Sequence, residues 1–284
     1  CPENSLVGCV AVAMGQVMYY WEHPEQGSGY SQYYSQDYGV LSVVFSDFEY
    51  DFSNMNDNTA TYDSQLLLYH SGVAVHMNYT PWASGASVCW EGPSAQSALD
   101  NNFNYNDDIT CEVKINYSDE DWHNLILDQL NRGWPMVYRG YSDDAGHAWN
   151  IDGYQNEYFH CNWGWGGSAN GYFYFDNLNG GGYNFIENQA ALLNILPDNI
   201  EPPIALFDYS INDRSVQFYN LSDMINDDVI SSFNWDFGDQ NTSDELSPFH
   251  IYEDYGDYVA TLTVTSEFGL QSEEHIEYLN ILDL

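Results

Sequence analysis

A single cysteine stands directly before a helix-like apolar stretch, a placement that could support nucleophilic chemistry. Cys9 lies in the segment LVGCVAVAMGQVMYYW, and Gly8 before it lets another part of the backbone approach closely. The dipole and free N–H groups of a helix N-terminus lower a thiol pKa, so we expect Cys9 to be activated there. The stretch alone is equally compatible with a buried structural thiol or half of a disulfide. A nucleophile also requires a histidine to hold the proton and a group to orient that histidine.

Eight histidines could be that base. His147 is distinctive, because DDAGHAWNIDGY places it at the start of an expected strand, after a glycine-containing turn. His160, in YFHCNW, is expected within a strand in a structural role. The other six lie in expected helices, at helix ends or near the C-terminus, where a surface or capping role is favoured: His23, His70, His76, His123, His250 and His275.

The segment CNWGWGG, residues 161–167, places two tryptophans among three glycines. Such a segment suits a site where large side chains alternate with positions at which the backbone comes close to a neighbour. It could instead be an aromatic plug in a β-rich core. In the functional interpretation, Asn162 hydrogen-bonds to the base histidine. Trp163 or Trp165 then shields that hydrogen bond from water.

Hydrophobic periodicity predicts the elements that must position these residues. Apolar residues recur at helical spacing across 9–21, and Pro24 closes this helix. Further helices are expected at 64–75, 94–103 and 118–130, the last opening with Ser118 and Asp121 as a capping pair. From Trp134 onward, short aromatic and β-branched runs separated by turn residues predict antiparallel sheet. Helices followed by strands indicate an α+β fold.

A proline-rich stretch at 197–203 marks a linker between two domains. Beyond it, successive short strands such as SVQFYNLS and GDYVATLTVTS predict a small β-sandwich. The sequence therefore predicts one α+β domain over residues 1–198 and one all-β domain over residues 199–284.

Charge is the most unusual bulk property: four lysines and arginines stand against 43 acidic residues, for a formal net charge of -39. Such a surface repels nucleic acid and anionic membranes, so neither is an expected partner. It suits high salt, bound divalent cations or a cationic partner, or simply a saline or cold environment that favours acidic surfaces. No apolar run is long enough to span a bilayer, so no membrane insertion is expected.

The start of the chain and its cysteines suggest an exported protein. The chain begins at Cys1 without an initiator methionine, as expected of a trimmed product that has lost its export signal. An odd count of five cysteines implies one thiol left over. Cys1, Cys89, Cys111 and Cys161 allow three pairings if Cys9 is the free thiol, and the sequence does not choose among them.

Three motifs together resemble the streptopain family of secreted bacterial cysteine peptidases: GCVAVAMGQVMYYWEHP, GHAWNIDG and NWGWGGSANGYFYFDNL, in that order. LLLYHSGVAVHMNYTPWASGAS is similar to the family's connecting helix and loop. The resemblance covers residues 1–198 and implies a papain-like fold, extracellular location and peptide-bond hydrolysis without a cofactor. By motif position it implies Cys9 as nucleophile and His147 as base, with Asn162, Trp163 and Trp165 in the orienting segment.

The chain departs from the family near the nucleophile. Family members carry a glutamine shortly before the cysteine to complete the oxyanion hole, whereas Glu3 stands at that distance here. The missing donor could lie on residues upstream of this chain, and Gln16 is two turns too far along the helix. A peptidase-derived structural or adhesive protein with vestigial activity is the alternative. A Cys1–Cys161 disulfide tying the chain start to the sheet is a further hypothesis.

The C-terminal segment FNWDFGDQNTSDELSPFHIYEDYGDYVATLTVT resembles the PKD-type repeat of extracellular proteins. The resemblance implies an immunoglobulin-like sandwich for adhesion, spacing or substrate presentation, through which the protein could self-assemble or contact a cell surface or matrix. Asp236 and Asp239 could bind structural calcium, although short Asp side chains also cap such turns. In the first domain, the glycine-rich segment 179–185 could border the active-site cleft or be a plain surface loop.

Overall fold

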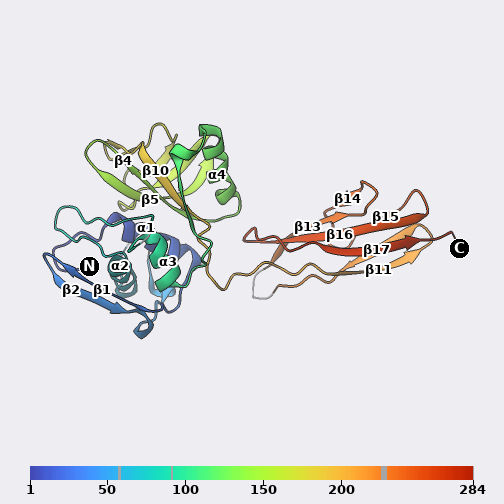
Figure 1. Cartoon of the computed structure of the whole chain (residues 1–284), viewed down its shortest axis with the longest axis horizontal. Coiled ribbons are helices and arrows are strands. Elements are labelled where there is room, and N and C mark those ends of the chain that lie inside the picture. The colour runs from blue at the N-terminus through green and yellow to red at the C-terminus, as the bar shows by residue number, and fades with distance from the viewer. Residues whose placement is uncertain (57–58, 91, 225–228, 284) are drawn as a thin grey trace. The chain divides into compact units, whose positions relative to one another are not determined.

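The computed structural model describes residues 1–56, 59–90, 92–224 and 229–283 (Figure 1). The chain forms two compact units, Cys1–Asp198 and Asn199–Leu284. The first unit combines helices with a six-stranded sheet, and the second is built from strands. The fold class is therefore α+β followed by an all-β sandwich, as the sequence predicts.

The helix that begins at the candidate nucleophile has the predicted bounds, Cys9–Trp21, and is α1. The predicted apolar stripe is its buried face, since Val10, Ala13, Met14, Val17 and Met18 are each at most 1% exposed. The remaining helices are α2 (Tyr62–Ala74), α3 (Ala95–Phe103), α4 (Asp119–Asn131) and the 3-10 turns η1 (Phe45–Asp47), η2 (Phe52–Asn54) and η3 (Lys114–Asn116).

Local capping explains where two of the predicted helices begin. Ser118 precedes α4 and accepts a hydrogen bond from the Asp121 N–H at 3.1 Å, while its hydroxyl donates to the Asp121 carboxylate. This confirms the predicted capping pair. Ser94 precedes α3 and forms a capping box with Ser97.

The sheet of the first unit has the strand order β3-β10-β4-β5-β6-β7, and the predicted antiparallel pairing is confirmed. It packs against α1 through a polar contact, because Asn150 donates from Nδ2 to the carbonyls of Ala13 and Met136, each at 3.1 Å. Its strands are β3 (Thr110–Val113), β4 (Met136–Tyr141), β5 (Gly146–Gln155), β6 (Tyr158–Asn162), β7 (Gly171–Phe173) and β10 (Glu187–Leu193), and two hairpins add β1 (Tyr30–Ser35) with β2 (Gly39–Val44) and β8 (Asn179–Gly180) with β9 (Tyr183–Asn184).

The disulfide joins Cys89 to Cys111, so the hypothesis of a Cys1–Cys161 bridge is wrong. Cys161 points into the core of the sheet half and is fully buried, whereas Cys1 is exposed at the start of the chain. Cys1, Cys9 and Cys161 are all free thiols, so three cysteines are left over and not one. The bond connects the loop before α3 to strand β3, and thereby links the helical half to the sheet half.

The second unit is a sandwich of two antiparallel sheets, β11-β12-β15 and β14-β13-β16-β17. Its core includes the fully buried side chains of Trp235, Phe218 and Leu262. The strands are β11 (Phe207–Asn212), β12 (Ser215–Asn220), β13 (Ile230–Asp236), β14 (Thr242–Ser243), β15 (Phe249–Ile251), β16 (Gly256–Ser266) and β17 (His275–Ile281).

The two aspartates proposed for calcium cap turns of this sandwich. Asp236 accepts from the Gly238 N–H at 2.8 Å, and Asp239 accepts from the Asn241 N–H, the Asn241 side chain and His250. Within the described ranges, no group of three or more His, Cys, Asp or Glu side chains could hold a metal ion. The geometry favours the capping alternative over calcium.

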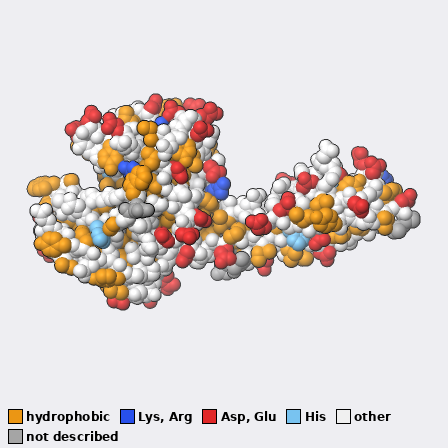
Figure 2. Space-filling model, viewed as in Figure 1, with side chains coloured by type: hydrophobic (Ala, Val, Ile, Leu, Met, Phe, Trp, Pro, Cys, Tyr) orange, Lys and Arg blue, Asp and Glu red, His pale blue; other side chains and the backbone are white. Residues whose placement is uncertain are grey.

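Carboxylates are spread over both units on the face shown in Figure 2, with few basic side chains among them. Two of the four cations are paired locally, Lys114 with Asp119 and Arg132 with Asp128. Among the described residues, no helix is both long enough and apolar enough to cross a bilayer.

Candidate active site

Cys9 lies at the first turn of α1, beside strand β5. Gly8 precedes it with φ 92°, a backbone conformation that residues with a side chain rarely adopt, and this favours glycine there. Ala148, the residue after His147, directs its backbone N–H at the Cys9 sulfur. Helix α1 and strand β5 therefore bring the predicted nucleophile to the residue that directly follows the predicted base.

Burial raises the pKa of the Cys9 thiol above its ordinary value. The N–H groups of Ala148, Val10 and Cys9 itself act in the opposite direction, by a smaller amount. The donors expected at a helix N-terminus are present and lower the thiol pKa as predicted, but desolvation outweighs them, so the net shift of the pKa is upward. The resting thiol is therefore protonated at neutral pH.

His147 occupies the start of β5 and pairs with Gly140 of β4. Its Nε2 lies 2.9 Å from the Trp163 carbonyl oxygen, which can only accept, so the ring proton resides on Nε2. Burial lowers the pKa of His147, and the Trp163 carbonyl raises it by less. The imidazole is thus neutral near pH 7, and the lone pair on Nδ1 is available to take a proton.

Asn162 does not supply the acceptor for His147 that the sequence predicts. Its Oδ1 accepts from the Gly164 N–H and from Nδ2 of Asn170, each at 3.2 Å. Asn170 in turn accepts the Trp163 N–H at 3.0 Å. Because β6 ends at Asn162, its side chain holds the following turn, and the backbone carbonyl of Trp163 becomes the orienting group.

Aromatic rings enclose His147. The Trp165 ring stacks on the imidazole with centroids 4.6 Å apart, and the Phe185 ring lies at 5.3 Å. Trp163 is fully buried, whereas Trp165 is 37% exposed. The carbonyl–imidazole contact is consequently screened from water on this side.

The glycine-rich segment 179–185 packs on these tryptophans. A Cβ at Gly180 would come within 2.5 Å of the Trp163 ring, and one at Gly181 within 2.7 Å of the Trp165 ring. Of the two alternatives for this segment, this packing favours the one in which the segment borders the candidate site. Sequence reasoning missed Asn170 and Phe185 as individual contributors. The available signal in the sequence was that a glycine-rich segment could pack against the bulky rings of CNWGWGG.

Two other histidines of the first unit make side-chain hydrogen bonds. His70 is 2% exposed and hydrogen-bonds to the Tyr50 hydroxyl at 2.8 Å, so its expected surface or capping role is wrong. Burial lowers the pKa of His70 to about 4. His160 lies in β6 and pairs with Asp152, which agrees with a structural role.

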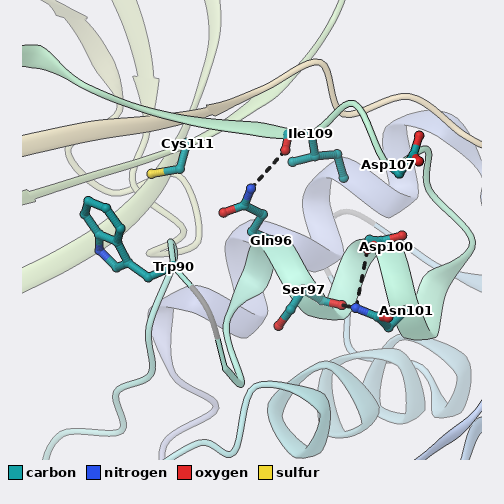
Figure 3. A pocket seen from close by; sticks show the side chains of 8 residues that line it. All are labelled: Trp90, Gln96, Ser97, Asp100, Asn101, Asp107, Ile109 and Cys111. Atoms are coloured by element: carbon teal, nitrogen blue, oxygen red, sulfur yellow. Dashed lines mark hydrogen bonds between the residues drawn. The ribbon is translucent and has the colours of Figure 1, made fainter. Parts of the chain in front are cut away.

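A cavity of about 410 Å³ lies beside the disulfide and the helix α3, away from this constellation (Figure 3). Gln96 crosses it and donates to the Ile109 carbonyl at 2.9 Å. The residues that line it are Trp90, Gln96, Ser97, Asp100, Asn101, Asp107, Ile109 and Cys111, and the candidate catalytic residues are not among them.

Comparison with known proteins supplies the family. The sequence model of the Peptidase C10 family matches residues 1–173, and that of the PKD domain matches residues 200–281. Streptopain from Streptococcus pyogenes is 29% identical over 218 residues, which cover 69% of this chain and 54% of streptopain. The thiol protease/hemagglutinin PrtT from Porphyromonas gingivalis is 29% identical over 240 residues, covering 78% of this chain and 27% of that protein.

A solved structure agrees with both the sequence match and the fold. Active wild-type interpain A, a cysteine protease from Prevotella intermedia, superimposes with a TM-score of 0.62 at 32% identity, over 68% of this chain and 84% of interpain A. The chain spans about half the length of the streptopains it matches. On these grounds it belongs to the Peptidase C10 family, the streptopain family, and carries a PKD domain after its peptidase domain.

Proposed function

We propose that this protein is a cysteine endopeptidase, with Cys9 as nucleophile and His147 as general acid and base. The observation that carries the proposal is a partly buried thiol near the backbone N–H of Ala148, the residue after a histidine whose Nε2 is held by the Trp163 carbonyl. Asn162, Trp163 and Trp165 are assigned to positioning and shielding that histidine. Membership of the Peptidase C10 family supports the same chemistry.

The reaction we propose is acyl transfer from a peptide bond. His147 Nδ1 takes the thiol proton as the Cys9 sulfur attacks the scissile carbonyl carbon, and a tetrahedral oxyanion forms. The Cys9 backbone N–H at the helix start is one donor to that oxyanion. His147 then protonates the leaving amine as the C–N bond breaks, and water hydrolyses the resulting thioester with His147 as base.

Starting the reaction with a neutral thiol and a neutral imidazole suits this site. Burial disfavours both charged forms, so the proton moves during attack and a resting ion pair is not required. Neither Glu3 nor Gln16 is proposed as the second oxyanion donor. Glu3 is exposed near the chain start, and Gln16 points to a different cavity of the first unit.

Each of the two units has a separate proposed role. We assign catalysis on protein or peptide substrates to residues 1–198, and spacing, substrate presentation or contact with a surface to residues 199–284. An extracellular location is proposed as well, because the Cys89–Cys111 disulfide persists in oxidising compartments.

A peptide probe that alkylates active-site thiols tests the assignment. We expect one adduct per chain on Cys9, absent in Cys9→Ala and retained in Cys1→Ser, which removes the exposed thiol as a matched control. Peptide hydrolysis should follow the same pattern. Absence of labelling in the reduced full-length protein would favour the alternative of a structural or adhesive protein with vestigial activity.

A further inference from the structure

Arg139, in strand β4, is a cation that lacks a carboxylate partner. The other two strong cations of the first unit are neutralised locally, Lys114 by Asp119 and Arg132 by Asp128. None of the ion pairs among the described residues includes Arg139, although the chain has 43 acidic residues. The charge of its guanidinium group is therefore available to a ligand.

Strand pairing places Arg139 on the sheet face that carries the candidate nucleophile. Arg139 lies opposite Ala148 of β5 and opposite Ala190 of β10, and opposed residues of antiparallel strands project from the same face, with Cβ atoms about 5 Å apart. Both alanines belong to the hydrophobic core against which Cys9 packs. Because the Ala148 N–H is directed at the Cys9 sulfur, the Arg139 side chain begins one residue away from the nucleophile.

Exposure along β4 shows that the Arg139 side chain extends from the core to the solvent. Val137, Arg139 and Tyr141 share one face of the strand, because side chains two residues apart point the same way. Val137 is fully buried, Arg139 is half-buried and Tyr141 is 41% exposed. The aliphatic stem of an arginine packs on apolar surface while its charged end stays in water. Arg139 thus occupies the margin of the core, beside the start of α1.

Tyr141 adds a second donor beside the guanidinium group. Arg139 Nη1 donates to the Tyr141 hydroxyl oxygen at 3.4 Å in an exposed contact, and its guanidinium carbon lies 5.6 Å from the centre of the ring. A contact of this length is a weak hydrogen bond, and the described residues offer the guanidinium no other. The hydroxyl accepts in this contact, so its own hydrogen remains free to donate.

Two adjacent donor groups, one of them charged, fit a carboxylate. A guanidinium group binds a carboxylate through two parallel N–H···O bonds, and such charge-assisted bonds are the strong ones. A polypeptide whose scissile carbonyl lies at the Cys9 sulfur passes over this part of the sheet. The carboxylates that it presents within its chain are aspartate and glutamate side chains.

We propose that Arg139 and Tyr141 bind an aspartate or glutamate side chain of the substrate next to the scissile bond, and so make the peptidase selective for acidic sequences. The inference rests on the proposed function, and it names the substrate class. A net charge of -39 repels acidic polypeptides at long range, so the selectivity must come from this local contact. At physiological salt the long-range term is screened beyond about 8 Å, whereas the direct pair persists.

A glutamate scan of a peptide substrate tests the proposal. In a fluorogenic peptide of otherwise glutamine-rich sequence, glutamate replaces glutamine at each position on either side of the cleaved bond, in NaCl at physiological strength. The two side chains have nearly the same shape and differ in charge. We expect glutamate at one position close to the bond to raise kcat/KM by at least ~10-fold, because it gains a charge-assisted pair.

Matched variants assign the selectivity to Arg139. Arg139→Gln should abolish the advantage of the glutamate peptide and change kcat/KM for the glutamine peptide by no more than roughly 2-fold. Arg139→Glu should make a lysine peptide a better substrate than the glutamate peptide. Tyr141→Phe should reduce the advantage by about 3-fold. Arg132→Gln removes the same charge at the end of α4 and should leave the advantage intact.

Binding to a chain that cannot cleave separates this inference from the proposed function. The full-length Cys9→Ala chain should bind the glutamate peptide at least ~10-fold more tightly than the glutamine peptide in fluorescence anisotropy. Adding Arg139→Gln to Cys9→Ala should equalise the two affinities. Selective binding by Cys9→Ala, without cleavage of either peptide by the unmodified chain, would contradict the proposed function and leave this inference standing.

Three results would overturn the inference. The first is equal kcat/KM for glutamate and glutamine at every position in a chain that cleaves, a comparison that needs no variant. The second is equal loss of the advantage in Arg139→Gln and Arg132→Gln, as expected from a general effect of charge. The third is equal affinity of Cys9→Ala for the two peptides. If the unmodified chain also cleaves neither peptide, the proposed function fails with it.

Discussion

Two histidines, one in each unit, are held in nearly the same way. His147 has its Nε2 2.9 Å from the Trp163 carbonyl and its ring stacked on Trp165. His250 has its Nε2 2.7 Å from Asp239 and its ring stacked on Phe237, with centroids 4.2 Å apart. Each imidazole is oriented by an acceptor and covered by an aromatic ring.

The difference lies in what else reaches the ring. The Cys9 thiol lies near the backbone N–H of Ala148, the residue after His147. The second unit has no thiol, because all five cysteines of the chain lie before it. His250 instead contacts the buried Tyr252 ring, and its bond to Asp239 fastens a turn of the sandwich. An oriented, shielded histidine is therefore a structural device by default, and we propose a catalytic role only for the one that has a thiol near its strand.

Removing each histidine in turn should give the largest difference between the two units. We expect His147→Ala to lower kcat/KM for peptide hydrolysis by at least ~10³-fold, because it removes the general base and acid. His250→Ala should leave kcat/KM unchanged and lower the unfolding temperature of the second unit. Steady-state kinetics and calorimetry on both variants check this. Equal loss of activity in both would contradict the assignment.

Removing the support of the Trp163 carbonyl should have the next largest effect on activity. Asn170→Ala deletes the acceptor for the Trp163 N–H, so the Trp163 carbonyl shifts and kcat falls by roughly 10- to 100-fold. KM should change little, since Asn170 is expected to act through the turn that carries Trp163. Asn170→Asp keeps an acceptor oxygen and should restore most of kcat. Failure of this rescue would show that the hydrogen bond from Asn170 Nδ2 to Asn162, which aspartate cannot make, matters more than the acceptor for Trp163.

The two aromatic covers should separate activity from stability. Trp165→Ala uncovers His147 and should lower kcat by about 10-fold with little loss of stability, because the ring is 37% exposed. Phe237→Ala removes a ring that is 3% exposed and should cost about 3 kcal/mol of unfolding free energy in the sandwich, without affecting kcat. Denaturant melts alongside kinetics distinguish the two outcomes.

The smallest expected effect is a pH dependence confined to the second unit. Burial alone raises the pKa of Asp239, but hydrogen bonds from His250 and Asn241 outweigh it and hold the pKa below its ordinary value. Stability from this carboxylate is therefore present above a pH of about 4 and lost as pH falls through its folded-state pKa. Asp239→Asn should flatten that acid limb in thermal melts. An unchanged acid limb would contradict this.

Periodicity and motif order predicted the parts of the fold that depend on local pattern. The helix 9–21 has its predicted bounds because the 3.6-residue apolar stripe is its buried face. His147 was singled out by its turn and strand context, and the resemblance to a family gave it a role. The resemblance also implied the orienting segment 162–165.

Tertiary contacts decided what the sequence could not. The acceptor for His147 is a backbone carbonyl, and every residue type carries one, so composition cannot identify it. The Cys89–Cys111 pairing depends on how the loop before α3 meets β3. Burial by the surrounding fold raises the pKa of the Cys9 thiol. This effect outweighs the lowering by the N–H groups at the helix start, which is the part that the sequence reveals.

Trapping the covalent intermediate tests the central claim most directly. The full-length protein is mixed with a peptide ester substrate, quenched in acid within the first turnover and digested for mass spectrometry. We predict a mass increase equal to the acyl group on the fragment that contains Cys9, and its disappearance in Cys9→Ala. Substrate turnover with the acyl group on another residue, or with no acyl-enzyme at Cys9, would contradict the account.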